Sequence, residues 1–348
     1  MKSILSLFFI LTVSLPFFGQ SKYQLTKEEQ NQILKEAEDW IDDMPEGLQD
    51  RLSDAVLHSL SGFFSELYSF RGMTITNLHP DSTVLMKDLV EGNGLPTLRL
   101  YQSKNLKGNK ITPLLVYFHG GGWTLGSTKI VDAYCSFLAS SGKVRVVSVD
   151  YPLSPENKYS EILSKCFNTI NFIIDNPGKF GTSKNLISLG GDGAGGNLVL
   201  NLMNCNAGVL SKPEVIRSLI LYYPLTGGQI HQATKMRREY GRGYGLDGRL
   251  LDSFYLSVGS NEKIEEGKNP TEYDSLAKVT LTKTYPPILM IEAGRDIIIE
   301  QEKDLQKNLG GKVTTVLFEG AIHGFISDGH QKTALRKAVE LSLAFLTE

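Results

Sequence analysis

Five short stretches of this chain carry glycine, acidic residues or histidine, and each follows an apolar run. They are HGGGW (119–123), DYPLSPE (150–156), GDGAGGN (191–197), GRD (294–296) and AIHGF (321–325). Consecutive glycines let backbone N–H groups approach a ligand oxygen. A carboxylate such as Asp296 can orient an imidazole such as His323, which then acts as a base. Each feature is common in ordinary loops, so only their joint occurrence favours a site.

The stretch LGGDGAGGNL (189–198) has the pattern of a G-x-S-x-G elbow, a sharp strand-to-helix turn that exposes a nucleophile. Gly193 occupies the central position where the chemistry requires a hydroxyl group. The N–H of Ala194, at the start of the expected helix, adds the positive end of the helix dipole. The same glycines also fit a tight turn with no catalytic role.

The surrounding pattern predicts the elements that would bring these stretches together. Residues 95–104 alternate as a half-exposed strand, and nearly continuous apolar runs follow at 113–118, 144–149, 186–191, 218–223, 287–293 and 313–318. Helical patterns separate them at about 128–141, 160–176, 194–207, 299–309 and 330–347. Such alternation indicates an α/β fold with a doubly wound, mostly parallel sheet of eight strands, buried on both faces. Ligands bind such sheets at the carboxyl ends of the strands, where the five stretches lie.

Two segments do not fit the alternation and predict a helical cap. Residues 21–82 are helical and polar-rich, and Thr26 with Glu29 forms a capping box at their start. Residues from about 226 to 284 interrupt the main domain (83–348) after its sixth strand. Residues 1–20 combine Lys2 with an apolar run of signal-peptide length, which predicts export to the periplasm or outside the cell.

Bulk composition narrows the function classes. The chain has 348 residues, 41% of them hydrophobic, and a formal net charge of −2. It has no basic block that would favour nucleic acid or an anionic membrane. A small, roughly neutral molecule is the expected partner, and no cofactor is expected. Cys135, Cys166 and Cys205 match no zinc spacing, so we expect no metal, and buried free thiols are favoured over a disulfide.

From about residue 85 onward the chain resembles the hormone-sensitive-lipase-like branch of the α/β-hydrolases, a group of bacterial esterases. The resemblance rests on HGGGW, DYPLSPE, GDGAGGN, the Asp296 segment and HGF. It implies an oxyanion hole formed by Gly121, Gly122 and Ala194, with Asp296 and His323 as acid and base. Trp123 and the cap would shape a pocket for small to medium acyl groups. The residues that would brace these motifs are His119, Gly120, Asp150, Glu156 and Asp192.

In that family the centre of the elbow is serine, so Gly193 changes the expected chemistry. Without a side-chain nucleophile no acyl-enzyme can form at this position, and turnover should fall on the order of a million-fold. Three hypotheses follow. The chain is an esterase scaffold with strongly reduced hydrolysis, or an enzyme such as a lyase in which the His323–Asp296 pair acts on water or substrate, or a non-catalytic binding protein.

Overall fold

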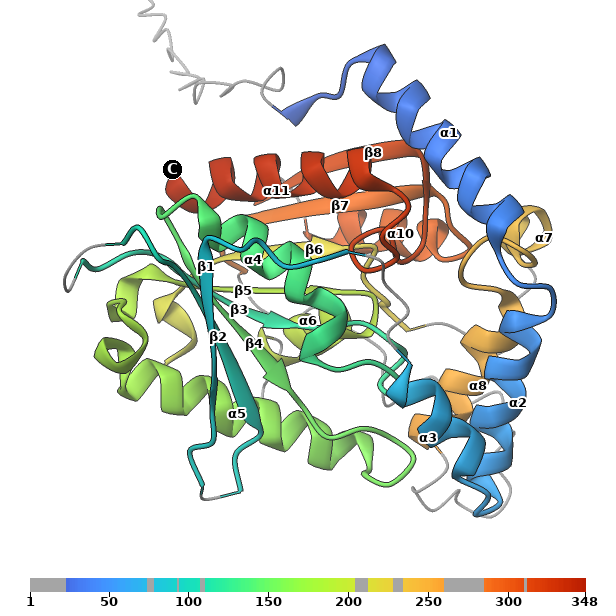
Figure 1. Cartoon of the computed structure of the whole chain (residues 1–348), viewed down its shortest axis with the longest axis horizontal. Coiled ribbons are helices and arrows are strands. Elements are labelled where there is room, and N and C mark those ends of the chain that lie inside the picture. The colour runs from blue at the N-terminus through green and yellow to red at the C-terminus, as the bar shows by residue number, and fades with distance from the viewer. Residues whose placement is uncertain are drawn as a thin grey trace, which may run out of the picture.

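The computed structural model describes residues 23–73, 78–92, 94–106, 110–203, 212–227, 234–259, 285–309 and 312–348. The expected signal peptide, Cys205 and much of the expected 226–284 insertion lie outside these residues. Within them, one sheet has eight strands in the order β1-β2-β4-β3-β5-β6-β7-β8 (Figure 1). Their bounds are Val84–Leu89, Thr97–Ser103, Leu114–Phe118, Arg145–Asp150, Ile187–Asp192, Ile216–Tyr222, Ile288–Arg295 and Val313–Ile322 for β1 to β8.

The sheet is mostly parallel, as the sequence predicts. From β4 to β8 all neighbouring strands run parallel, whereas β1 and β2 pair antiparallel at one edge. All residues of β3 and β5 are buried, which explains their continuous apolar runs. The edge strand β1 has no matching run because four of its six residues are exposed.

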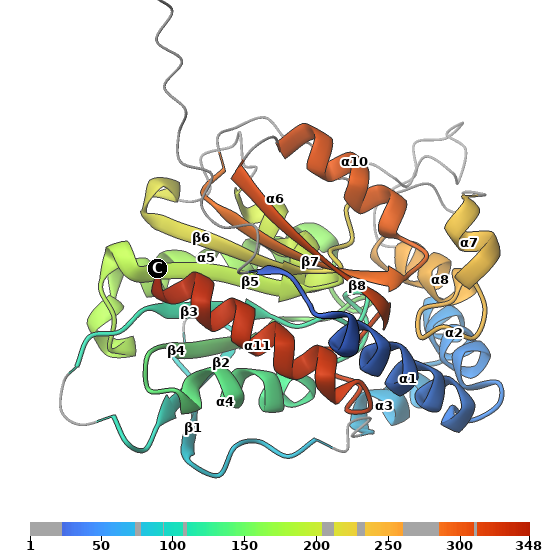
Figure 2. The same cartoon turned by 90° about the horizontal axis from the view of Figure 1, so that it is seen from above.

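Helices cover both faces of the sheet. In Figure 2, α4 and α11 lie on one face and α5, α6 and α10 on the other. Their bounds are Asp132–Ser140 (α4), Tyr159–Asp175 (α5), Ala194–Met203 (α6), Ile299–Leu309 (α10) and Lys332–Thr347 (α11). Most bounds agree with the expected ranges within two residues. The expected helix at 128–141 instead begins with a 3₁₀ turn over Thr128–Val131.

Further helices gather beside the carboxyl ends of the strands (Figure 1). They are α1 (Lys27–Asp43), α2 (Leu48–Leu60), α3 (Ser65–Gly72), α7 (Lys235–Tyr240) and α8 (Gly248–Gly259). The capping box is present, because Glu29 N–H donates to Thr26 Oγ1 at 3.1 Å and Thr26 N–H to Glu29 Oε2 at 2.8 Å. The Gln30 amide of α1 bonds the Leu317 carbonyl and the Glu319 N–H of edge strand β8, at 2.9 Å each. These bonds fix α1 against the sheet.

Candidate active site

Gly193 forms the turn between β5 and α6. Its φ of 50° lies in the left-handed region, which glycine adopts without the steric cost of a β-carbon. Its N–H donates to the Tyr222 carbonyl at 3.0 Å, and its carbonyl accepts from Asn197 N–H at 3.1 Å and Leu225 N–H at 3.0 Å. The chain therefore forms the strand–turn–helix elbow that its sequence predicts, with glycine at the tip.

The expected acid and base meet beside this turn. Asp296 directly follows β7 and His323 directly follows β8. His323 Nδ1 lies 2.6 Å from Asp296 Oδ2, and the Asp296 carboxylate is buried. The other oxygen, Oδ1, accepts from Ile298 N–H at 3.2 Å. A β-carbon added to Gly193 would lie 3.2 Å from His323 Nε2. The imidazole is thus oriented by a carboxylate and presents its free nitrogen to the tip of the elbow.

The glycine loop after β3 lines the same cavity. Gly121, Gly122 and Ala194 are all among the lining residues. Ala194 is the first residue of α6, where backbone N–H groups have no partner within the helix. A β-carbon on Gly122 would come within 2.1 Å of the Phe254 ring of α8, so only glycine permits this approach. These positions suit donors to a developing oxyanion.

The Asp192 carboxylate holds the glycine loop in place through a hydrogen bond. Its Oδ1 accepts from Tyr117 Oη at 2.9 Å and from Gly120 N–H at 3.0 Å. Burial raises the pKa of Asp192 to about 6, although both hydrogen bonds act in the opposite direction.

His119 stacks on Tyr151 with ring centroids 4.3 Å apart. Burial lowers the pKa of His119, so its ring is neutral at pH 7.

The DYPLSPE stretch is tied to the cap by a residue that the sequence analysis missed. Arg71 in α3 pairs with both oxygens of Glu156, at 2.5 and 2.9 Å. Its guanidinium also donates to the Thr124 carbonyl at 2.8 Å and the Ser154 carbonyl at 2.6 Å. Asp150 accepts from Thr128 N–H at 3.3 Å. Arg71 thus joins α3 to two loops of the main domain, but nothing local in YSFRG marks it for this role.

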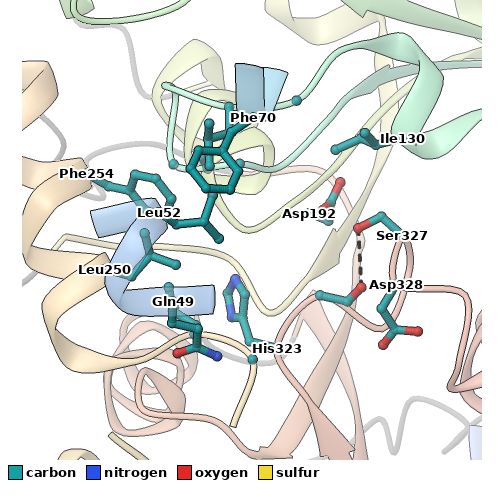
Figure 3. A pocket seen from close by; sticks show the side chains of 18 of the residues that line it. Gln49, Leu52, Phe70, Ile130, Asp192, Leu250, Phe254, His323, Ser327 and Asp328 are labelled. Carbon is teal, nitrogen blue, oxygen red and sulfur yellow. Dashed lines mark hydrogen bonds between the residues drawn. The ribbon is translucent and has the colours of Figure 1, made fainter. Parts of the chain in front are cut away.

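A largely apolar cavity of about 490 Å³ lies above the elbow. Figure 3 shows Leu52, Phe70, Leu250 and Phe254 on one side of His323, and Ile130, Ser327 and Asp328 on the other. The apolar side chains come from α2, α3 and α8, so the cap supplies much of the wall. A cavity of this size and lining suits a small organic ligand with few polar groups.

Trp123, expected in the pocket, is not among the residues described as lining this cavity. Its side chain is fully buried, and its ring contacts Tyr159 edge-on and Tyr255 at a tilt, each with centroids 5.9 Å apart. The tryptophan that lines the cavity is Trp40 of α1. The spacing of the apolar residues in α1 indicates ordinary helix packing, so the sequence pattern did not single out Trp40.

Three further observations concern the described residues only. Among them, no group of three or more His, Cys, Asp and Glu side chains is arranged to hold a metal ion. Their helices include none with the length and apolarity needed to cross a membrane. Cys135 and Cys166 are buried free thiols, and burial raises the pKa of both. These two thiols are therefore protonated and poor nucleophiles.

Comparisons with solved structures agree with this architecture. An ester hydrolase from the metagenome of Lake Arreo superposes with a TM-score of 0.70 at 23% identity, over 90% of this chain and 98% of that one. An esterase from Pyrobaculum calidifontis gives a TM-score of 0.65 at 23% identity, over 93% and 98% of the two chains. At these identities the likeness establishes the fold.

Sequence comparisons extend the agreement to the family. An arylesterase of Saccharolobus solfataricus is 34% identical over 69% of this chain and 76% of its own length. The carboxylic ester hydrolase LipN of Mycobacterium tuberculosis is 29% identical over 63% of this chain and 59% of its own length. A family model described as alpha/beta hydrolase fold matches residues 115–327, more than half of the chain. The chain belongs to the esterase family of the alpha/beta hydrolases.

Proposed function

We propose that this chain is a carboxylic-ester hydrolase scaffold whose hydrolysis is strongly reduced because position 193 has no nucleophile. The observation that carries the proposal is the His323–Asp296 pair. Its Nδ1–Oδ2 distance is 2.6 Å, and its Nε2 lies 3.2 Å from the place of a β-carbon on Gly193. In a serine hydrolase this nitrogen takes the proton of the attacking hydroxyl. The pair therefore supports a site arranged for acyl transfer.

The proposed ligand is a small to medium acyl ester. Its carbonyl oxygen would receive hydrogen bonds from the backbone N–H groups of Gly121, Gly122 and Ala194. Its acyl or alcohol group would occupy the apolar cavity of about 490 Å³. Oxyanion donors and binding alone retain roughly a thousand-fold acceleration over water when the catalytic side chains are removed. Weak residual hydrolysis is therefore expected.

Nearby serines do not offer an obvious replacement nucleophile. Ser188 lies within β5, and its Oγ bonds Ser218 Oγ at 2.8 Å. The Ser127 Oγ accepts from Lys129 N–H at 3.3 Å in the turn that begins at Thr128. Ser327 does line the cavity, and its hydroxyl donates to the Gly324 carbonyl at 3.3 Å. Ser327→Ala is thus the control that tests whether residual activity comes from this hydroxyl.

The test is turnover of short acyl esters by the Gly193→Ser variant. Restoring the hydroxyl should raise turnover by several orders of magnitude, and adding His323→Ala should remove the gain. If a folded serine variant remains as inactive as the parent from acetyl to octanoyl esters, the esterase proposal is wrong. Consumption of another substrate through His323 would then favour a lyase, and binding without consumption would favour a binding protein.

We also propose that the chain is exported through residues 1–20. The supporting observation is the apolar segment after Lys2. Fractionation of expressing cells, with sequencing of the N-terminus of the mature chain, tests this proposal. Retention of residues 1–20 on a membrane-bound product would instead indicate an uncleaved anchor.

A further inference from the structure

One wall of the ligand cavity is shared with a second cavity on the outer side of the cap. The second cavity measures about 340 Å³ and lies between the α1–α2 corner and the segment before α8. Met44, Leu48 and Gln49 line both cavities. These three side chains therefore separate the space above the elbow from the outer cavity.

The contact that closes this wall is weak. Gln49 Nε2 donates to Met44 Sδ at 3.5 Å, and a thioether sulfur is a poor acceptor. Gln49 Oε1 is buried and has no hydrogen-bond partner among the described residues. In Figure 3 the amide points away from Phe70 and Leu52. An unpaired buried acceptor costs free energy that hydration would recover, so the closed wall is less favourable than an apolar one of the same shape.

The surroundings allow the wall to open by side-chain rotation. Met44 is the C-cap residue of α1 and Gln49 lies in the first turn of α2, so both stand at a helix corner. Methionine is unbranched and adapts to changes of shape at little cost. On the outer side, Ile41, Pro45 and Leu48 provide apolar surface, next to the charged lining residues Glu46, Asp50, Arg242 and Asp247. A methylene chain that passed the wall would find contacts there.

We propose that Met44 and Gln49 form a gate through which linear acyl chains longer than the ligand cavity extend into the outer cavity. Gln49 is then a specificity-determining residue for acyl length, and the proposal rests on the ester-binding function proposed above. Short acyl groups stay within the inner cavity and do not reach the gate. Longer chains rotate Gln49 aside, which exposes its amide to water and buries additional methylenes against Ile41 and Leu48.

The experiment measures binding, because the unsubstituted protein can hold an ester without rapid hydrolysis. Methyl esters of saturated acids from butanoate to tetradecanoate are titrated, with tryptophan fluorescence as the readout. Trp40 lines the cavity and Trp123 is buried elsewhere. Each additional buried methylene is expected to raise affinity about fourfold. In the unsubstituted protein and in Gln49→Ala this rise continues beyond the length that fills the inner cavity.

Gln49→Leu is the decisive variant, because it removes the unpaired amide and places a branched apolar side chain of similar size, without the adaptability of methionine. Its wall has no polar group to hydrate, so the rise in affinity should stop at the length that fills the inner cavity. Leu52→Ala is the matched control, since Leu52 lies on the same helix and lines only the inner of these two cavities. It should change affinity by a similar factor at all lengths and leave the slope beyond that length unchanged.

The outcomes separate the gate from the proposed function. If esters bind but Gln49→Leu gives the same dependence on chain length as the parent, the gate is refuted while the ester site stands. If Leu52→Ala flattens the slope as Gln49→Leu does, a general change in cavity shape is responsible and the gate is again refuted. If no ester binds at any length, the proposed function fails and the gate fails with it.

Discussion

A serine at position 193 is expected to raise ester turnover and, in the same protein, to lower the stability of the fold. The two effects have different origins. The hydroxyl would supply the nucleophile for which His323 and Asp296 are already placed. The β-carbon, however, must occupy a backbone conformation with φ of 50°, which side chains rarely adopt. Gly193→Ser therefore adds a nucleophile and, at the same time, places a side chain in a backbone conformation that favours glycine.

The magnitudes follow from the geometry. A non-glycine residue in the left-handed region costs about 1–2 kcal/mol. The β-carbon would lie 3.2 Å from His323 Nε2, so the ring must retreat by a few tenths of an ångström. Loss of the serine from such a triad lowers turnover on the order of a million-fold, equivalent to about 8 kcal/mol of barrier. The gain in transition-state stabilisation therefore exceeds the loss of folding free energy several times.

The assay pairs kcat/KM for p-nitrophenyl butyrate with the free energy of unfolding in urea, measured on the parent, Gly193→Ser and Gly193→Ala. The alanine variant carries the β-carbon without the hydroxyl, so it should lose the same stability and gain no activity. Equal activity of the serine and alanine variants, both folded, would refute the reasoning. So would an alanine variant as stable as the parent, because the turn would then impose no cost on a side chain.

Three further changes have defined outcomes. Asp296→Asn in the Gly193→Ser background should lower kcat by about four orders of magnitude, because the amide leaves the imidazole in the wrong tautomer. A loss of less than tenfold would show that Asp296 does not orient His323. Arg71→Met should lower the free energy of unfolding by about 2 kcal/mol, since Glu156 loses its ion-pair partner in a half-buried setting, and an unchanged urea midpoint would contradict this. Burial raises the folded-state pKa of Asp192 to about 6 from 3.8, so the folded state binds the extra proton and stability falls as pH rises from about 4 to about 6. Asp192→Asn should remove about 3 kcal/mol of that pH dependence in urea titrations, and an identical profile would contradict the assignment.

The sheet and the five strand-end stretches could be predicted from sequence because both depend on local patterns. Buried parallel strands appear as continuous apolar runs, and the elbow and glycine loop follow them directly. The order of elbow, acid and base then placed Asp296 and His323 at one edge of the sheet. The position of the edge strand β1 could not be predicted, because most of its residues are exposed and form no apolar run.

The walls of the cavity could not be predicted in the same way. Arg71 and Gln49 act through partners more than 50 residues away or through cavities formed by several helices, and such pairings leave no local signal. Trp123 was expected in the pocket because it belongs to the HGGGW motif. The glycine loop turns its indole into the core against Tyr159 instead.

The buried acid of the site gives a physical reason to connect the missing serine with chemistry rather than with packing alone. Asp296 is 1% exposed, and its carboxylate is held by one imidazole and one backbone N–H. Burying a charge with so few partners costs stability, and apolar side chains of similar volume would serve the fold as well or better. The elbow, in contrast, is at its least strained with glycine. In the proposed acyl-transfer site, the costly buried acid is therefore present and glycine occupies the position of the nucleophile, which is the combination that restoring the hydroxyl tests directly.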